Sequence, residues 1–363
     1  MALTQAQAGN PDRAGEAGAY ELLINGWARS AGQMGMNTAS ITGLEAMRFN
    51  VGGLAFVEKT EIHVSYTNWL QGTGTNIVKG GIAQKLGESN VIGVSIMNTS
   101  FGAIMRTTTT NPEGGLGTFN PSFLNIGLSF ARSFSNSIHG GVVIRLVNER
   151  VDDVNSSGFA LDAGIQYVTG PRENIHFGVS IRNIGTAMKF GGDGLTFRAP
   201  DPATGEYNIT VSQRSQKFEL PSVLHIGAAY DIYFGANSSK KSIQNETEEG
   251  EEEEGEEEEE EANPFNKITI SANFTSNSFG KDNYGFGIEY SYRGAFALRF
   301  GYRFENGMFS DTENTRAELG FAGGATVEIP LANNGRTRMG IDYAYRPTNP
   351  WNGTHSIGLR FNL

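Results

Sequence analysis

The chain has no cysteine among its 363 residues, which excludes disulfide bonds and thiolate metal sites. It also has no apolar run of 18 or more residues, so the sequence predicts no membrane-spanning helix. Charged residues make up only 18% of the chain and hydrophobic residues 38%. Such low hydropathy is compatible with a membrane β-barrel, because only every second residue of a barrel strand faces lipid.

The negative charge is confined to one segment. Of the 39 acidic residues, 13 lie between Glu246 and Glu261, and without them the formal net charge would change from −11 to +2. We interpret residues 235–263 as an acidic low-complexity insertion, because blocks of like charge are usually solvated spacers. A binding site for a basic partner or for loosely held calcium is the alternative. An acidic chain disfavours a nucleic-acid partner.

Alternation of polar and apolar residues is the strongest pattern present. Near the end of the chain, Ile357, Leu359, Phe361 and Leu363 alternate with polar or small residues, as in the closing strand of an outer-membrane barrel. Residues 284–304 contain a hairpin in which aromatic residues share one face on both arms. Its three-residue loop contains a glycine and predicts that Tyr292 pairs with Phe296.

This pattern occurs about fourteen times after residue 60, and most segments have the 9–11 residues that cross a bilayer at a tilt. The fold class is therefore all-β, a transmembrane outer-membrane β-barrel of about 14 antiparallel strands. The expected strands are residues 62–69, 78–86, 91–101, 123–134, 138–148, 159–168, 175–183, 223–234, 267–274, 284–292, 296–304, 317–329, 338–345 and 354–363.

Loop lengths give an orientation and the domain division. With the amino terminus in the periplasm, short connections fall inside and long ones outside, as is usual, except that the acidic insertion falls on the periplasmic side. The barrel spans residues 60–363, and residues 9–59 form an N-terminal segment that we expect to act as a plug. Residues 1–8 end in Ala-Gln-Ala, which resembles a cleavage site, and we interpret them as a signal-peptide remnant.

The plug segment has no period of two, and Thr42 with Glu45 resembles a capping box that begins a short helix through Phe49. A 14-stranded barrel leaves interior space for such a segment. The lumen faces of the strands are rich in glycine, which either makes room for it or lets the strands curve. These glycines are Gly93, Gly127, Gly141, Gly164, Gly178, Gly227, Gly287, Gly301, Gly320 and Gly340.

Short motifs carry a family resemblance. Residues 28–35 (ARSAGQMG) precede residues 50–55 (NVGGLA), and together they resemble the start of FadL-like long-chain fatty-acid transporters. With residues 158–167 and the glycine-rich loop 191–194, the chain more closely resembles the PorV/PorQ family of the type IX secretion system of Bacteroidetes. The resemblance implies a 14-stranded barrel with an N-terminal plug, integral to the bacterial outer membrane and in contact with the lipid bilayer.

It also implies partners. PorV-like members bind the C-terminal signal domains of secreted cargo and pass them from the type IX translocon barrel to the surface attachment complex. PorQ-like members are accessory parts of that complex. Apolar residues in the long outer loops are the candidate partner-binding residues, although they could equally pack the loops together. They are Met105, Phe119, Met188, Phe190, Leu195 and Phe197.

Ionisable residues on the lumen faces have mixed signs, so we expect ion pairs within the wall or with the plug. They are Arg145, Asp162, Arg182, Asp231, Glu289, Arg299, Arg303, Glu318, Arg338 and Asp342. The five histidines stand singly without the short-gap companions of a metal site, and no serine motif completes a catalytic triad. We therefore expect no metal, no cofactor and no enzymatic activity.

The leading hypothesis is a non-enzymatic component of type IX protein secretion that binds cargo signal domains. The alternatives are a FadL-like channel for hydrophobic small molecules and a PorQ-like scaffold of the attachment complex. The mixed lumen charges weigh slightly against an apolar conduit.

Overall fold

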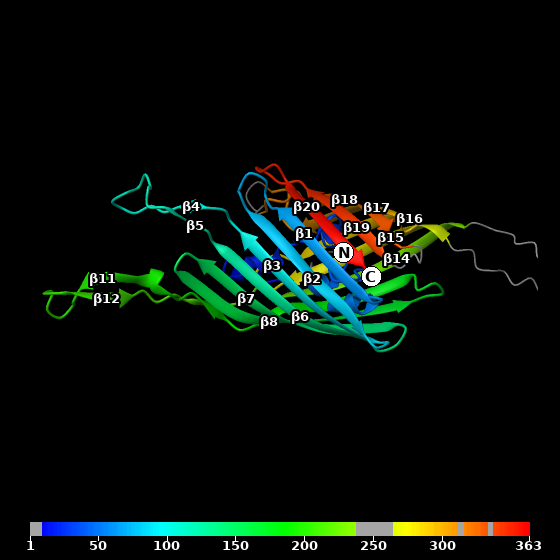
Figure 1. Ribbon diagram of the computed structural model, residues 1–363, viewed down its shortest axis with the longest axis horizontal. Helices are drawn as coiled ribbons and strands as arrows, with labels where there is room; N and C mark the ends of the chain where they lie inside the picture. The colour runs from blue at the N-terminus through cyan, green and yellow to red at the C-terminus, as the bar shows by residue number, and fades with distance from the viewer. Residues whose placement is uncertain (1–8, 237–263, 311–315, 333–336) are drawn as a thin grey trace, which may run out of the picture.

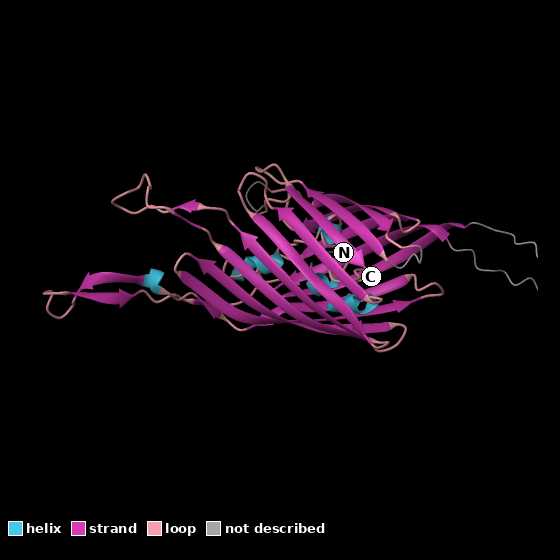
Figure 2. Ribbon diagram, in the orientation of Figure 1, coloured by secondary structure: helices cyan, strands magenta, loops and turns pink. Residues whose placement is uncertain are grey.

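The computed structural model describes residues 9–236, 264–310, 316–332 and 337–363. The predicted signal-peptide remnant and nearly all of the acidic insertion lie outside these residues. Within them, 14 antiparallel strands close into one barrel, in which β1 pairs with both β2 and β20 (Figures 1 and 2). The predicted fold class is confirmed. None of the described helices is long and apolar enough to cross a membrane.

Each predicted strand corresponds to one strand of the barrel. In barrel order these are β1 (Thr60–Asn68), β2 (Asn76–Leu86), β3 (Asn90–Ser100), β6 (Ser122–Ser133), β7 (Ile138–Val151), β8 (Val154–Thr169), β9 (Ile175–Gly185), β14 (Val223–Ala236), β15 (Pro264–Asn277), β16 (Asn283–Tyr292), β17 (Phe296–Glu305), β18 (Phe321–Pro330), β19 (Arg338–Arg346) and β20 (Thr354–Asn362). The predicted pairing of Tyr292 with Phe296 is confirmed.

Two predicted strand starts are wrong by four residues or more. The strand expected from residue 159 begins at Val154. The strand expected from residue 317 begins at Phe321, because Glu318 forms an isolated bridge with Thr348 instead of joining the ladder to β17. Gly320 separates the two regions with a φ of +87°, a left-handed conformation that glycine adopts without strain.

The outer surface of the barrel is apolar. Leu128, Ile144 and Ile165 project outward and remain 59%, 55% and 57% exposed, and the predicted aromatic face of β16 and β17 is also exposed. An apolar surface that surrounds the molecule is far larger than the patches tolerated on proteins in water. Lipid is the solvent that such a surface requires.

The long connections contain small ribbons of their own. β4 (Ile104–Met105) pairs with β5 (Thr118–Phe119), β10 (Met188–Lys189) with β13 (Lys217–Phe218), and β11 (Thr196–Pro200) with β12 (Asn208–Ser212), preceded by the short helix η4 (Asp193–Leu195). The β4–β5 and β11–β12 ribbons extend from the same end of the barrel (Figure 1). The short turns before β3, β7, β9 and β17 lie at the other end, whereas the two-residue turn between β7 and β8 lies at the loop end, where Asp152 pairs with Arg106.

The N-terminal segment, residues 9–59, lies against the inward faces of the strands. It contains η1 (Pro11–Arg13), η2 (Tyr20–Leu23), α1 (Ala28–Ala31), α2 (Ala46–Phe49) and η3 (Val51–Phe56). Its buried side chains form the main apolar core with inward residues of the strands, including Ala83, Val91 and Val143. Figure 2 shows its short helices inside the ring of strands. Its function as a plug stays a prediction.

Candidate functional site

Glycines on the inward strand faces leave the space that the N-terminal segment occupies. A Cβ at Gly301 would lie 2.1 Å from the carbonyl carbon of Gln33, and one at Gly178 would lie 2.6 Å from the carbonyl oxygen of Thr38. A Cβ at Gly164 would meet Oδ1 of Asn50 at 2.2 Å. These glycines could either make room for the segment or let the strands curve, and the contacts favour the first interpretation.

Asn50 is the polar anchor of the segment. Its side-chain amide donates to the carbonyl oxygens of Thr38 (3.1 Å) and, across to the wall, Ile165 (2.9 Å). Its Oδ1 accepts from the N–H of Gly52 (3.1 Å) and thereby caps η3. Asn50, which belongs to the motif that resembles the FadL-like family, thus fixes the segment to β8.

The predicted capping box is wrong. Glu45 precedes α2 but makes no capping hydrogen bond within it. Its Oε2 instead accepts from the backbone N–H of Ser30 (3.0 Å), and the hydroxyl of Thr42 accepts from the guanidinium of Arg29 (3.2 Å). Both side chains therefore hold α1 and α2 together, and the helix is confined to residues 46–49.

A cavity of about 300 Å³, here called the arginine cavity, lies between the N-terminal segment and the loop end of the barrel. Its apolar lining comes from Leu23, Ile24, Ala31, Met34, Met36, Phe49, Trp69, Leu70, Val223 and Ala317. The charged lining residues are Arg48, Arg182, Arg303, Arg316, Arg346 and Glu318. Glu318 accepts from both Arg303 and Arg346, so part of this charge is neutralised.

Two arginines of this cavity have no carboxylate partner within 4.0 Å among the described residues. Arg48 donates to the carbonyl oxygen of Ile24 (3.3 Å) and Arg182 to that of Leu22 (3.3 Å). Both guanidinium groups lie near the ring of Phe49, at 5.1 and 6.0 Å from its centroid. Burial and the positive charges of Arg182 and Arg145 lower the pKa of Arg48 well below its ordinary value.

A β-bulge adds a second inward side chain next to Arg182. The register between β8 and β9 shifts next to Asp162, so two consecutive residues of β9, Arg182 and Asn183, both point inward and are buried. Asn183 has a φ of +59°, and its N–H donates to Oδ1 of Asp162 (2.7 Å). Simple alternation predicts an outward side chain at residue 183 and therefore misses the bulge.

A second cavity of about 270 Å³, the turn-side cavity, lies on the other side of the N-terminal segment. β14 and β15 line both cavities at opposite ends: His225 and Thr275 face the arginine cavity, while Asp231 and Thr269 face the turn-side cavity. The segment contributes Arg29, Gln33, Asn37, Ser40, Thr42 and Phe56 to the turn-side cavity. Residues 29–49 therefore separate the two cavities.

Most of the predicted lumen charges are paired. Arg145 donates to Asp162 (2.6 Å), Arg299 to Glu289 (2.5 Å) and Arg303 to Glu318. Asp231 accepts from His176 (3.2 Å) and Lys267 (3.4 Å), and Arg338 lies 3.7 Å from Glu328 at the turn end. Arg182 and Asp342 are the two predicted residues that lack an arginine, lysine or carboxylate partner within 4.0 Å in the described part of the chain.

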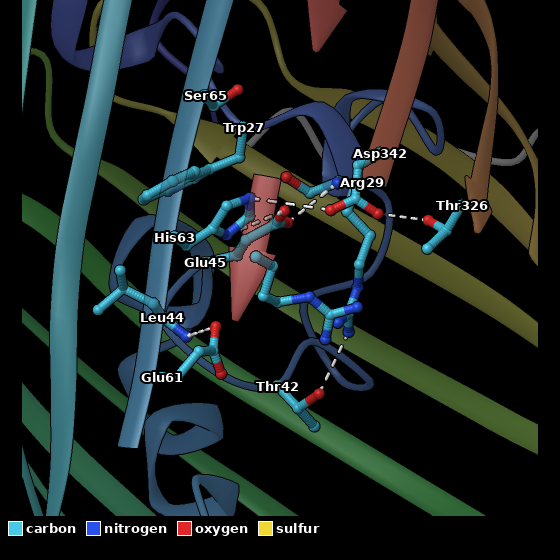
Figure 3. Close-up of polar contacts among 12 residues, drawn as sticks. Trp27, Arg29, Thr42, Leu44, Glu45, Glu61, His63, Ser65, Thr326 and Asp342 are labelled. Carbon is cyan, nitrogen blue, oxygen red and sulfur yellow. Dashed lines mark hydrogen bonds and ion pairs between the residues drawn. The ribbon is translucent and has the colours of Figure 1, made fainter. Parts of the chain in front are cut away.

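Asp342 instead belongs to a buried cluster with Glu45 and His63 (Figure 3). Nδ1 of His63 lies 3.9 Å from Oε1 of Glu45, and Nε2 lies 3.8 Å from Oδ2 of Asp342. The ring of Trp27 stacks on the histidine at a centroid distance of 4.4 Å. The sequence did not predict this cluster, because its members are far apart in the chain and come from the segment, β1 and β19.

The candidate partner-binding residues differ in exposure. Met105 and Phe197 are 55% and 53% exposed, and Phe119 and Leu195 are half-buried. The ring of Phe190 contacts that of Phe218 in a tilted arrangement, with the centroids 5.5 Å apart. The prediction is wrong for Met188, which is fully buried because it packs in a core cluster with Leu22, Val147 and Leu220.

No protein-family model matches the sequence. No curated protein matches it either. Solved structures match almost the whole chain. The toluene transporter TodX of Pseudomonas putida has a TM-score of 0.54 at 10% identity, over 93% of this chain and 97% of TodX. The CymD monoaromatic hydrocarbon channel has a TM-score of 0.52 at 12% identity, over 93% and 97% of the two chains. A TodX deltaS2S3 mutant has a TM-score of 0.52 at 12% identity, over 93% and 99%.

At such low identity these likenesses concern the fold alone. The chain shares its barrel fold with these hydrocarbon channels. The matched proteins are described as channels or a transporter, not as enzymes. The narrower PorV/PorQ assignment stays a prediction.

Proposed function

We propose that this protein is an outer-membrane channel for small hydrophobic molecules that carry an anionic group, such as fatty carboxylates. The observation that carries the proposal is the arginine cavity, in which Arg48 and Arg182 lie beside apolar side chains such as Phe49. Burial of an alkyl chain is favourable by about 0.8 kcal/mol for each methylene removed from water. A carboxylate would accept charge-assisted hydrogen bonds from the guanidinium groups, which lack an anionic partner among the described residues.

The position of the cavity supports a route through the barrel. The arginine cavity faces the loop end, and residues 29–49 separate it from the turn-side cavity. A molecule captured at the loop end can advance only if this segment shifts. The apolar outer surface of the barrel supports the membrane location, and the shared fold with hydrocarbon channels supports transport of hydrophobic cargo.

Binding of [1-¹³C]dodecanoate to the full-length protein in nonionic detergent tests the proposal by NMR of the carboxylate carbon. Dodecanol, which has the same alkyl chain without the charge, is the matched ligand. We expect the native protein to bind dodecanoate at least tenfold more tightly than the double variant R48M/R182M does. Dodecanol should bind both proteins alike, because the substitutions leave the apolar lining in place.

Arg106→Met is the matched control variant, since Arg106 lies in an outer loop where it pairs with Asp152. It should bind dodecanoate as the native protein does. Proteoliposomes then measure passage: the native protein should admit dodecanoate faster than R48M/R182M does. Equal binding by the native protein and the double variant, or no binding by either, contradicts the proposal.

The type IX export role is the second candidate, and the exposure of Met105 and Phe197 in the loop ribbons favours it. In that role the loops would hold cargo C-terminal signal domains, the translocon barrel and the attachment complex. Affinity purification from the host tests it. Recovery of these partners with the native protein but not with M105S/F197S would support the export role. Recovery of none of them would exclude that role.

A further inference from the structure

The buried cluster of Glu45, His63 and Asp342 contains four polar atoms that have no hydrogen-bond partner in the described structure. They are both ring nitrogens of His63, Oε1 of Glu45 and Oδ2 of Asp342. All three residues are at least 99% buried. Buried polar atoms normally have a partner, so four unpartnered atoms that face one another point to a missing group.

The charges of the cluster identify that group as a cation. Among the described residues, no arginine or lysine nitrogen lies within 4.0 Å of either carboxylate. Arg29, the nearest cation of the segment in Figure 3, donates to Thr42 at 3.2 Å. Arg29 acts on both carboxylates electrostatically but makes no ion pair with either. Buried carboxylates without a cation in contact are costly, and a bound metal ion would supply one.

We propose that Glu45, His63 and Asp342 bind a divalent transition-metal ion of the zinc class. One imidazole nitrogen and two carboxylate oxygens form a ligand set that suits such ions better than it suits magnesium or calcium. One ligand atom from each residue can be chosen so that all three lie within 4.8 Å of one another. Ligand atoms around a tetrahedral ion with bonds of about 2.0–2.2 Å lie roughly 3.3–3.6 Å apart. The three residues would therefore need to move only slightly closer together to bind an ion.

The surroundings hold the ligands in place. The other oxygen of each carboxylate is already occupied: Oε2 of Glu45 accepts from the N–H of Ser30 (3.0 Å), and Oδ1 of Asp342 accepts from the hydroxyl of Thr326. Trp27 fixes the plane of the His63 ring. Such outer contacts orient metal ligands and leave the unpartnered oxygen of each carboxylate facing the ion.

The site would tie the N-terminal segment to the barrel wall, because Glu45 belongs to the segment while His63 and Asp342 belong to β1 and β19. Arg29 and Thr42, which lie beside the cluster in Figure 3, also line the turn-side cavity. This inference concerns the anchoring of the segment and does not depend on which molecule the barrel transports.

Metal content and Zn²⁺ binding of the full-length protein in detergent test the inference. After chelator treatment and Zn²⁺ loading, elemental analysis should give about one zinc per native chain. His63→Gln, which keeps a polar side chain, should retain less than a tenth of that amount. His176→Gln is the matched control, because His176 also faces a lumen carboxylate but makes a hydrogen bond to it. It should bind zinc as the native protein does.

X-ray absorption on the zinc-loaded native protein is independent of whether His63→Gln folds. It should show one imidazole and oxygen ligands at about 2.0–2.1 Å. Removal of zinc should increase protease cleavage within residues 9–59 at least threefold. Substoichiometric zinc in the native protein, equal zinc in His63→Gln, or a spectrum without imidazole would each overturn the inference. A histidine that bridges the two carboxylates as a cation would give the first of these results.

Discussion

Arg145 donates to Oδ2 of Asp162 at 2.6 Å and to the carbonyl oxygen of Met47 at 3.3 Å. One guanidinium group thus joins β7 and β8 and binds the N-terminal segment to both. Oδ1 of Asp162 accepts from the N–H of Asn183 at the bulge. The wall, the segment and the strand that carries Arg182 therefore share one buried polar network.

Arg145→Met should destabilise the barrel by about 3–5 kcal/mol, because it removes the ion-pair partner of the buried Asp162 carboxylate. Urea unfolding in lipid vesicles measures this free energy. Arg106→Met is the control: the Arg106–Asp152 pair is partly exposed, and its loss should change the free energy of unfolding by less than about 1 kcal/mol. Equal effects of the two substitutions would count against the buried network.

Gly301→Ala should displace the N-terminal segment, since its Cβ would lie 2.1 Å from the backbone of Gln33. Overpacking of this kind costs about 1–3 kcal/mol. Hydrogen exchange at residues 30–36 should accelerate while exchange in the strands stays unchanged. Gly191→Ala is the matched control, because no atom lies within 4 Å of its added Cβ. A Gly301→Ala protein with native exchange would contradict the close approach.

The docking of the N-terminal segment should weaken as the pH rises. Burial and the neighbouring Glu149 carboxyl raise the pKa of Glu21 from 4.5 to about 8. The docked segment therefore holds a proton that the undocked segment releases, and docking loses stability between about pH 4.5 and pH 8. The equilibrium constant for undocking of the segment should rise by up to roughly tenfold per pH unit in this window.

Glu21→Gln should weaken this dependence, because glutamine stays neutral in both states. Cleavage of residues 9–59 by an added protease, corrected for the pH profile of the protease, measures the opening. Glu16→Gln is the control, since Glu16 is exposed and pairs with Arg13. If the native protein and Glu21→Gln open alike at pH 6 and pH 9, Glu21 does not hold the proton.

The strands could be predicted from sequence, and the interior could be predicted only in part. Lipid on one side and the lumen on the other impose a period of two, so Tyr284 to Tyr292 indicated both the strand and its outward face. The bulge at Arg182 and Asn183 breaks that period with residues of ordinary polarity, so nothing in the sequence marks it. Met188 follows a strand and was expected in an exposed loop, but the loop folds back and buries it.

The N-terminal segment shows the same division. Its presence and its space were indicated by the absence of a period and by glycines such as Gly301. Its contacts were not, because Glu45, His63 and Asp342 meet only after the barrel has closed. The spacing of residues that lie on β1, on β19 and in the segment contains no signal of their proximity.

Photo-crosslinking with a dodecanoate that carries a diazirine on its alkyl chain tests the proposed function most directly. Met34, Met36 and Phe49 line the arginine cavity, and we expect the label on the peptides that contain them. R48M/R182M should lose that label. Label confined to outward residues such as Leu128 and Ile144, at the same level in the native protein and R48M/R182M, would contradict the account.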